Sequence, residues 1–202
     1  MAGIVLAAGD SQRMGTPKAA IDLDGSSFVA RVLSALADGG AEPLLIVVGK
    51  DADTVRGALP RGREVALLRN PEPGRGQLSS LKVALAELLA NDATVAGAVV
   101  ALVDHPVVTP ATIAALVSAL QRSRADGAPA IALPRHLGKR GHPVGFSRAV
   151  WDELLATPDE LGARAVTRRV PGRVQEIDVD DPGVLLDIDT PDDLQRLRAG
   201  TS

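Results

Sequence analysis

Residues Ile4–Lys18 read IVLAAGDSQRMGTPK, an apolar run that leads directly into a loop with two glycines and two cations. The run does not alternate with polar residues, which predicts a strand that is buried on both faces. Gly9 and Gly15 let backbone N–H groups approach an anion closely. Arg13 and Lys18 offer a guanidinium fork and an ammonium charge to phosphate oxygens. The spacing differs from a Walker loop and from a dinucleotide fingerprint, so the stretch predicts a phosphate-binding loop of another kind. The alternative is that the glycines only turn the chain and the cations are solvated.

Two further apolar runs, Leu44–Val48 and Ala98–Val103, have the same character as the first and predict further central parallel strands. Between the runs, apolar residues return with a helical period. They are Phe28, Val29, Val32, Leu33 and Leu36, then Leu81, Ala84, Leu85, Leu88 and Leu89, and then Ile113, Leu116, Val117 and Leu120. This alternation predicts an α/β fold, a doubly wound and mostly parallel sheet flanked by helices, with ligands outside the carboxyl ends of its strands.

The length of 202 residues and the 46% hydrophobic composition favour a single domain over residues 1–202. The region from about Pro134 to Val179 is less regular in its pattern, and we interpret it as an insertion (134–179) that faces the substrate.

Composition excludes several classes of partner and site. The net charge of −3 gives no electrostatic surface for a nucleic-acid polymer or an anionic membrane. The absence of cysteine excludes disulfides and thiolate metal sites. The opening MAGIVLAAG has no basic segment, and no apolar run is long enough to span a bilayer. A soluble cytoplasmic protein, without nucleic-acid or membrane partners, is the expectation.

Two later segments follow predicted strands and carry candidate polar groups. Asp104 comes directly after Ala98–Val103, so its carboxylate is expected at the ligand-bearing edge, where Mg²⁺ takes carboxylate and phosphate oxygens. The alternative is an aspartate that ends a strand or caps the next helix. Asn70–Leu81 joins a strand to a helix through prolines and glycines, and free N–H groups at a helix start suit a base edge or a ribose. The alternative there is an ordinary capping serine pair on a surface loop.

The opening loop, written LAAG-x-S-x-RMG-x-x-K, resembles the opening signature of the nucleotidyltransferases related to the molybdenum-cofactor cytidylyltransferases. Three later segments resemble motifs of the same family in the same order. They are GQLSSL at Gly76–Leu81, GHP at Gly141–Pro143 and LDIDTPDDL at Leu186–Leu194, which is similar to the family's DIDTPEDL motif. Val103 and His105, on either side of Asp104, depart from the commoner family residues.

The resemblance implies a set of site residues. For nucleotide binding it implies Leu6, Ala7, Ala8, Gly9, Arg13, Lys18, Gly76, Gln77, Ser79 and Ser80. Arg13, Lys18 and Asp104 are implied as catalytic residues. Asp104 and Asp189 are implied as ligands of Mg²⁺, with Mn²⁺ as the alternative metal, although Asp189 is also placed well for the start of a helix. His142 and Pro143 are implied to lie near the second substrate.

The same resemblance implies transfer of CMP from CTP to the molybdopterin form of the molybdenum cofactor, with release of pyrophosphate. A recipient molybdoenzyme is a further expected partner. LAAG, rather than the LAGG more usual in guanylyl-transferring relatives, favours cytidine. A guanylyltransferase and a cytidylyltransferase for sugar or polyol phosphates are alternatives within this class, and a non-catalytic carrier of molybdopterin or nucleotide is the alternative from another class.

Overall fold

The computed structural model describes residues 1–9, 14–92, 94–126, 130–169 and 171–200. Within these residues one sheet has the strand order β10-β7-β9-β6-β1-β4-β5, and β8 pairs with β7 beside this path. The strands are β1 (Ala2–Ala7), β4 (Leu44–Val48), β5 (Ala66–Arg69), β6 (Gly97–Leu102), β7 (Ile131–His136), β8 (Lys139–Arg140), β9 (Val144–Ser147) and β10 (Val174–Asp178). A separate hairpin pairs β2 (Asp22–Leu23) with β3 (Ser26–Ser27). The three apolar runs form β1, β4 and β6, as predicted.

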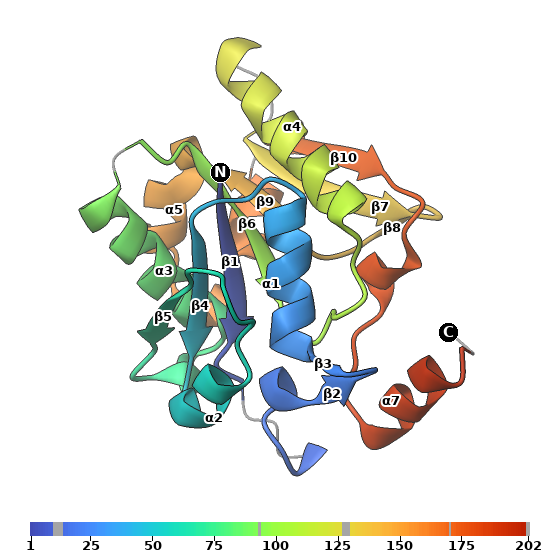
Figure 1. Cartoon of the computed structure of the whole chain (residues 1–202). Helices are drawn as coiled ribbons and strands as arrows, with labels where there is room; N and C mark the ends of the chain where they lie inside the picture. Colours follow the sequence, from blue (N-terminus) through green and yellow to red (C-terminus); the bar gives the residue numbers. More distant parts are fainter. Residues whose placement is uncertain (10–13, 93, 127–129, 170, 201–202) are drawn as a thin grey trace.

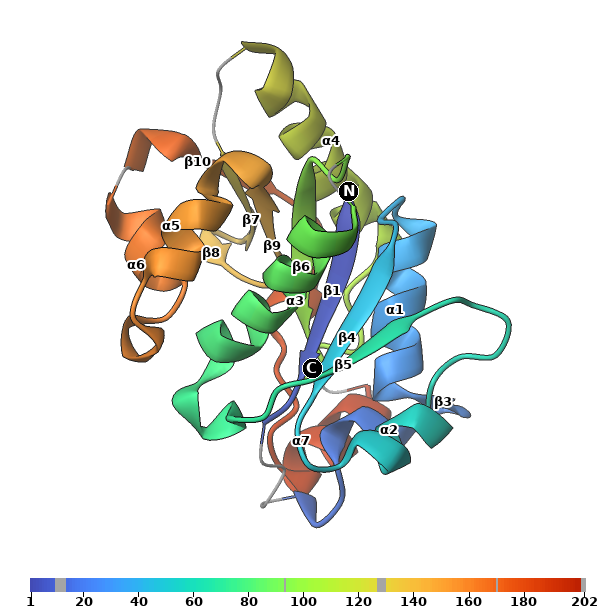
Figure 2. The ribbon, with the colours of Figure 1, turned by 90° about the vertical axis from the view of Figure 1, so that its left-hand side faces the viewer.

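Helices cover both faces of the sheet, as the two views in Figures 1 and 2 show. The longer helices are α1 (Phe28–Asp38), α3 (Gln77–Asn91) and α4 (Pro110–Asp126), and the shorter ones are α2 (Ala52–Gly57), α5 (Trp151–Ala156), α6 (Arg164–Arg169) and α7 (Pro191–Arg198). The short 3-10 helices are η2 (Lys18–Ala20), η3 (Pro73–Arg75), η4 (Arg148–Val150), η5 (Asp159–Leu161), η6 (Pro171–Arg173) and η7 (Pro182–Leu185). The prediction of a doubly wound α/β sheet is confirmed.

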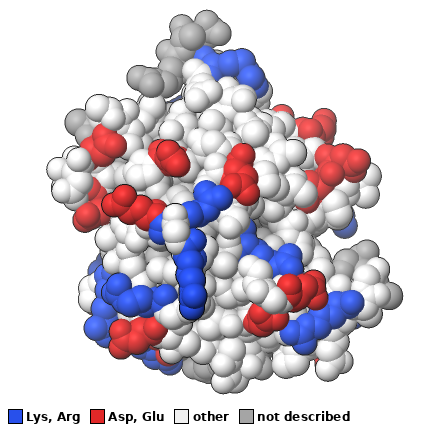
Figure 3. Space-filling view, in the orientation of Figure 1, with Lys and Arg blue, Asp and Glu red and all other residues white. Residues whose placement is uncertain are grey.

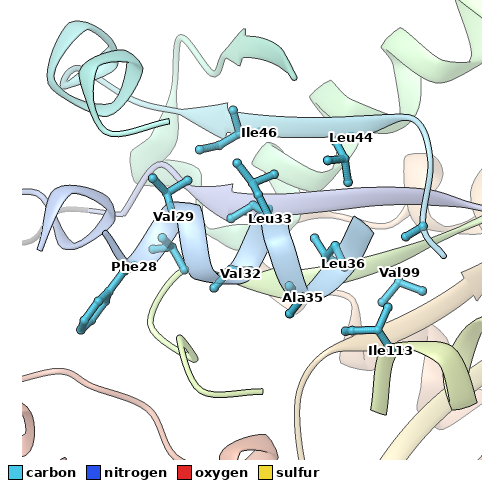
Figure 4. Close-up of a cluster of buried hydrophobic side chains, with 14 of the residues drawn as sticks. Phe28, Val29, Val32, Leu33, Ala35, Leu36, Leu44, Ile46, Val99 and Ile113 are labelled. Atoms are coloured by element: carbon cyan, nitrogen blue, oxygen red, sulfur yellow. The ribbon is translucent and has the colours of Figure 1, made fainter. Parts of the chain in front are cut away.

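The central strands bury side chains on both faces, which is why they are continuously apolar. In β1, Val5 packs into a core formed with α1 and α4, whereas Ile4 and Leu6 pack into a second core formed with α3 and α5. Figure 4 shows the first core, where Leu33 and Leu36 of α1 lie against β4. Alternation along the strand therefore distributes apolar residues between two cores instead of between a core and water.

Local sequence signals set the ends of α1. The Ser27 hydroxyl accepts a hydrogen bond from the Ala30 N–H at 3.2 Å, which caps the helix start. The helix ends at Gly39, where an added Cβ would lie 2.4 Å from the Cβ of Ile113 in α4. Only glycine permits this close approach, so the end of α1 packs directly against the start of α4.

The sheet is not wholly parallel. β9 runs antiparallel to both β6 and β7, and β8 runs antiparallel to β7, whereas the remaining pairs are parallel. The region 134–179 supplies β8, β9 and β10 to this sheet and also α5 and α6 beside it. Its role toward a substrate stays a prediction.

The carboxyl ends of β1, β4 and β6 lie at one edge of the sheet, because these neighbouring strands are parallel. In Figure 1 the arrowheads of β1 and β4 point to the lower edge, where α2 and α7 lie. Lys, Arg, Asp and Glu side chains are interspersed on the face seen in Figure 3. Within the described ranges, no helix combines the length and apolar character that crossing a membrane requires.

Candidate functional site

A cavity of about 260 Å³ opens at the carboxyl ends of the central strands, and we call it the loop cavity. It is lined by Leu6, Ala7, Ala8, Gly9, Met14, Pro17, Lys18, Ala19, Asp51, Pro73, Gly76, Gln77, Ser80, Leu102, Val103, Asp104 and Asp189. The loop after β1 forms its centre, with the segments after β6 on one side and those after β4 and β5 on the other. Its position outside the strand ends is the position where α/β sheets bind ligands.

One cation and two carboxylates meet in the loop cavity. The Lys18 ammonium lies 3.1 Å from Asp104 Oδ2, and it also forms an ion pair with Asp189 Oδ1. The exposed fractions of the three side chains are 14% for Lys18, 22% for Asp104 and 34% for Asp189. These charges are partly shielded from water, so their interactions with a charged ligand are stronger than those of surface charges.

Backbone contacts bring the three charged residues together from distant parts of the sequence. β1 and β6 are parallel neighbours, and the Val103 N–H donates to Leu6 O at 3.2 Å. The buried Ile188 then donates its N–H to Asp104 O at 2.9 Å, which places Asp189 beside Asp104. The sheet therefore fixes Asp104, and the backbone hydrogen bond from Ile188 joins the C-terminal segment to it.

A capping box follows Asp189 and begins α7. The Thr190 hydroxyl accepts from the Asp193 N–H, and Asp193 Oδ2 accepts from the backbone N–H groups of Thr190 and Asp189 at 2.7 and 3.1 Å. The hydrogen bonds from Thr190 lower the pKa of Asp193 from 3.8 to about 2. The capping interpretation and the ligand interpretation therefore concern different residues, because Thr190 and Asp193 form the capping box and Asp189 pairs with Lys18.

Asp104 and Asp189 have the chemistry of a magnesium or manganese site. Asp104 Oδ1 is buried and has no hydrogen-bond partner among the described residues. Within the described part of the chain no group of three or more His, Cys, Asp or Glu side chains could hold a metal ion. Two carboxylates with substrate phosphate oxygens are a common donor set for Mg²⁺, so the residues fit a metal that binds together with a phosphate ligand.

The start of α3 forms another wall of the loop cavity. Gly76 has φ of +99°, a conformation that other residues rarely adopt, and α3 begins directly after it at Gln77. The buried Asn70 donates from Nδ2 to the hydroxyls of Ser79 and Ser80, at 2.9 Å each. Ser79 in turn donates to Gly76 O at 2.7 Å, so it lies behind the wall, whereas Ser80 lines the cavity. Asn70 holds this wall in place.

A larger cavity of about 820 Å³, which we call the wide cavity, lies next to the loop cavity. Its lining includes Leu6, Arg75, Gly76, Gln77, Leu102, Leu133, Arg140, His142, Phe146, Arg164, Thr167 and Arg168. A third recess of about 430 Å³, the middle recess, includes Gln77, Asp104, His142, Arg164, Asp187 and Asp189 in its lining. Gln77 lines all three spaces, so the two cavities meet at the start of α3.

The arginines around the wide cavity differ in their partners. Arg140 pairs with Glu176, and Arg75 pairs with Asp159 at 2.8 Å. Arg164 and Arg168, one turn apart on α6, form no ion pair with another described residue. Their positive charges are therefore the ones in this cavity that remain available to an anionic ligand.

His142 lies where the wide cavity and the middle recess meet. Its ring centroid is 5.3 Å from that of His105, and its Nδ1 is buried without a hydrogen-bond partner among the described residues. Burial, reinforced by the neighbouring His105, lowers the pKa of His142 from 6.5 to about 4. His142 is therefore neutral near pH 7 and offers a hydrogen bond without a charge.

The structure brings most of the predicted site residues to the loop cavity. Leu6, Ala7, Ala8, Gly9, Lys18, Gly76, Gln77, Ser80, Asp104 and Asp189 line it. Arg13 lies outside the described residues, and Pro143 lines a small separate space between His105 and Ile113. The sequence reasoning did not single out Asp51, Asn70 or Arg164, although Asp51 follows a buried strand just as Asp104 does.

Comparison with known proteins identifies a family whose model matches most of this chain. Residues 3–175 match the MobA-like NTP transferase domain family. Nicotine blue oxidoreductase of Paenarthrobacter nicotinovorans is 32% identical over 204 residues, covering 96% of this chain and 95% of that protein. The molybdenum cofactor cytidylyltransferase of Escherichia coli (strain K12) is 25% identical over 94% of this chain and 91% of its own length.

Solved structures agree with the fold along nearly the whole chain. The crystal structure of Rv0371c from Mycobacterium tuberculosis H37Rv has a TM-score of 0.78 and 32% identity, covering 98% of each chain. A structure of Rv0371c in complex with manganese has a TM-score of 0.74 and 29% identity, covering 98% of this chain and 97% of that one. The names of the relatives cover both a redox enzyme and a cytidylyltransferase, so the substrate must be argued from the site.

Proposed function

Because the chain belongs to the MobA-like NTP transferase family, we propose that it transfers CMP from CTP to a phosphate-bearing acceptor, the molybdopterin form of the molybdenum cofactor. The observation that carries the proposal is the convergence of Lys18, Asp104 and Asp189 in the loop cavity, which Ala8 and Gly9 also line. A cation beside two carboxylates suits a triphosphate that binds with a divalent metal.

The reaction needs no nucleophile from the protein. An oxygen of the acceptor phosphate forms a bond to the α-phosphorus of CTP, and the bond from that phosphorus to the bridging oxygen breaks, so that pyrophosphate leaves. The acceptor oxygen is already ionised near neutral pH, so no general base is required. The protein then contributes position and charge neutralisation.

Each group in the loop cavity has its own role in this reaction. The backbone of Ala8–Gly9 contacts the triphosphate, and the Lys18 ammonium stabilises the negative charge that develops on the phosphates. Asp104 and Asp189 would hold Mg²⁺ or Mn²⁺, and the metal would neutralise charge on the phosphate oxygens. Arg13 is a further triphosphate contact on this hypothesis.

The wide cavity takes the acceptor on this proposal. It adjoins the loop cavity at Gln77, so an acceptor there reaches the α-phosphate of a nucleotide in the loop cavity. Arg164 and Arg168 supply charge for an anionic acceptor, and the neutral His142 supplies a hydrogen bond. The region 134–179, which provides these residues, is thereby the acceptor side of the site.

Two observations support cytidine as the base. The loop reads LAAG, and the match to the cytidylyltransferase of Escherichia coli covers 94% of this chain. The bound manganese in the Rv0371c complex supports a divalent metal.

The test is release of pyrophosphate from CTP, GTP, ATP and UTP with Mg²⁺, in the presence and absence of molybdopterin. We expect release from CTP that requires both the acceptor and the metal. A parallel thermal-shift panel with the same nucleotides measures binding, because a ligand that binds only the folded state raises its apparent stability. Binding of CTP without any pyrophosphate release, in the presence of metal and acceptor, would instead identify a carrier.

A further inference from the structure

We infer that Asp51 reads the nucleobase and selects bases that carry an exocyclic amino group over uracil. The inference rests on the proposed function, because it assigns the base end of the same nucleotide site. Asp51 lines the loop cavity, follows β4 and is half-buried.

The loop cavity has two ends, set by the order of the strands. Asp104 follows β6, the phosphate loop follows β1, and Asp51 follows β4, in the spatial order β6-β1-β4. Neighbouring strands lie about 4.8 Å apart, so the Asp104 and Asp51 ends are separated by about 10 Å. A nucleotide with its phosphates at Lys18 and Asp104 therefore extends its base toward Asp51.

The segments after β4 and β5 enclose the Asp51 end. An added Cβ on Gly49 would lie 3.0 Å from Ala8 O and 3.5 Å from Pro73 Cγ, so these segments are in close contact. Ser80 adds a hydroxyl to the lining of the cavity, and Asn70 fixes that hydroxyl. The cavity thus offers polar groups beside Asp51 on a compact wall, as a base-binding site requires.

The Asp51 carboxylate has no structural role that accounts for it. Asp51 occupies the N-cap position of α2, yet its side chain accepts no hydrogen bond from the helix. No ion pair or hydrogen bond joins its carboxylate to the rest of the described chain. The carboxylate is therefore available to a ligand in the cavity.

The charge of Asp51 determines which part of a nucleotide fits beside it. A carboxylate repels phosphate but accepts hydrogen bonds from the amino group of cytosine. Uracil presents a carbonyl oxygen at the same position, which repels a carboxylate oxygen. Asp51 therefore favours CTP over UTP, and it would favour an amino-bearing purine over UTP by the same contact.

The experiment compares the dissociation constants of CTP and UTP, each with Mg²⁺, for the wild-type protein, Asp51→Asn and Asp53→Asn. An asparagine amide can rotate to donate to uracil or to accept from cytosine, so Asp51→Asn should lower the preference for CTP over UTP about tenfold. Asp53→Asn removes the same charge from an exposed position on α2 that does not line the cavity, and it should leave the ratio unchanged.

The outcomes separate the two proposals. Equal affinities of the wild-type protein for CTP and UTP, or equal effects of both variants, would overturn the role of Asp51 and leave the transferase intact. If the wild-type protein binds GTP or ATP more tightly than CTP, and Asp51→Asn lowers that nucleotide's preference over UTP, the role of Asp51 is supported and cytidine as the base is overturned. Absence of pyrophosphate release from every nucleotide in the wild-type protein overturns the proposed function.

Discussion

The loop cavity and the wide cavity are neighbours, but the chain builds them differently. The loop cavity is formed directly after buried parallel strands, and three of its charged side chains are joined by ion pairs from Lys18 to Asp104 and Asp189. The wide cavity shares β1, β6 and the start of α3 with the loop cavity, but the rest of its lining comes from β7, β8, β9, η5 and α6, and its arginines differ in whether they have acidic partners. A side chain at the end of a central strand is held in position by the backbone hydrogen bonds of the sheet, whereas a side chain on a short helix is held by few contacts.

This difference indicates how the labour is divided between the two spaces. On the proposed function, the loop cavity performs the part of the reaction that requires fixed geometry, namely holding a triphosphate and a metal. The wide cavity on the same proposal recognises the acceptor, for which charge and volume matter more than exact placement. Variants in the loop cavity should therefore affect the rate, and variants in the wide cavity should affect binding of the acceptor.

The largest effect is expected for Lys18→Ala. Removal of the ammonium takes away a charge that stabilises the developing charge in the transition state, so pyrophosphate release should fall about hundredfold or more. The circular dichroism spectrum should remain that of a folded protein, because the cores of the sheet do not include Lys18.

The control for this experiment is Arg63→Ala, which removes a surface cation that pairs with Asp38. It should leave the rate of pyrophosphate release unchanged. If Lys18→Ala also kept the wild-type rate, the loop cavity would not be the place of phosphate chemistry, and the comparison between the cavities would fail.

The next largest effect is expected for Gly141→Ala, at the junction between the wide cavity and the C-terminal segment. An added Cβ would lie 2.2 Å from Val184 O, so the backbone must move, at a cost of about 3 kcal/mol in the free energy of unfolding. Gly172→Ala has open space around its Cβ and should change that free energy by less than about 0.5 kcal/mol. Urea unfolding of both variants measures the difference, and equal stabilities would show that the junction is loose.

The sequence predicted the loop cavity far better than the wide cavity. Asp104 was predictable because it follows a continuously apolar strand, and its position in space then depends only on the order of parallel strands. The same signal was present for Asp51 after Leu44–Val48, but no motif accompanied it. The placement of Asp189 depends on the hydrogen bond from Ile188 to Asp104, which periodicity does not encode.

The wide cavity was less predictable because its charges depend on pairing between distant segments. The sequence shows Arg135 and Arg140 in a local basic cluster, yet both pair with Glu176, which lies on β10. Arg164 and Arg168 also belong to a basic stretch, Arg164–Arg169, yet they line the wide cavity without an ion pair to another described residue. Local charge density therefore does not distinguish paired arginines from unpaired ones, since acidic partners arrive from elsewhere in the chain.

The contrast between these arginines gives a smaller predicted effect. Arg164→Ala should raise KM for the acceptor about tenfold, because a charge-assisted hydrogen bond is lost, and should leave the affinity for CTP unchanged. The Arg140 side chain is 60% exposed and already pairs with Glu176. Arg140→Ala should therefore raise KM for the acceptor by less than about twofold, the scale expected for an exposed ion pair. Steady-state kinetics with varied acceptor measure both, and the reverse order of effects would assign the acceptor to the hairpin of β7 and β8.

The smallest effect is expected for Thr190→Ala, which tests how the start of α7 holds Asp189 in the loop cavity. The Thr190 hydroxyl caps α7 and binds Asp193, whose Oδ2 also accepts the Asp189 N–H. Its loss should lower the melting temperature by about 2–4 °C, the usual scale for a helix cap in a chain of this size. Thr54→Ala, at an exposed position on α2, is the matched control and should leave the melting temperature unchanged.

The pH dependence gives this variant a specific signature. The pKa of Asp193 is about 2 in the folded protein and 3.8 ordinarily, so its contribution to stability is present above pH 3.8 and is lost as the pH falls toward 2. Without the Thr190 hydroxyl, this pKa should rise toward its ordinary value, which carboxyl NMR titration measures. Asp193 also accepts a hydrogen bond from the Asp189 N–H, so the variant should reduce the rate of pyrophosphate release. The reduction should be smaller than that caused by Lys18→Ala. A pKa that stayed at about 2 would mean that the backbone N–H groups and Arg196, rather than Thr190, hold the Asp193 carboxylate beside Asp189.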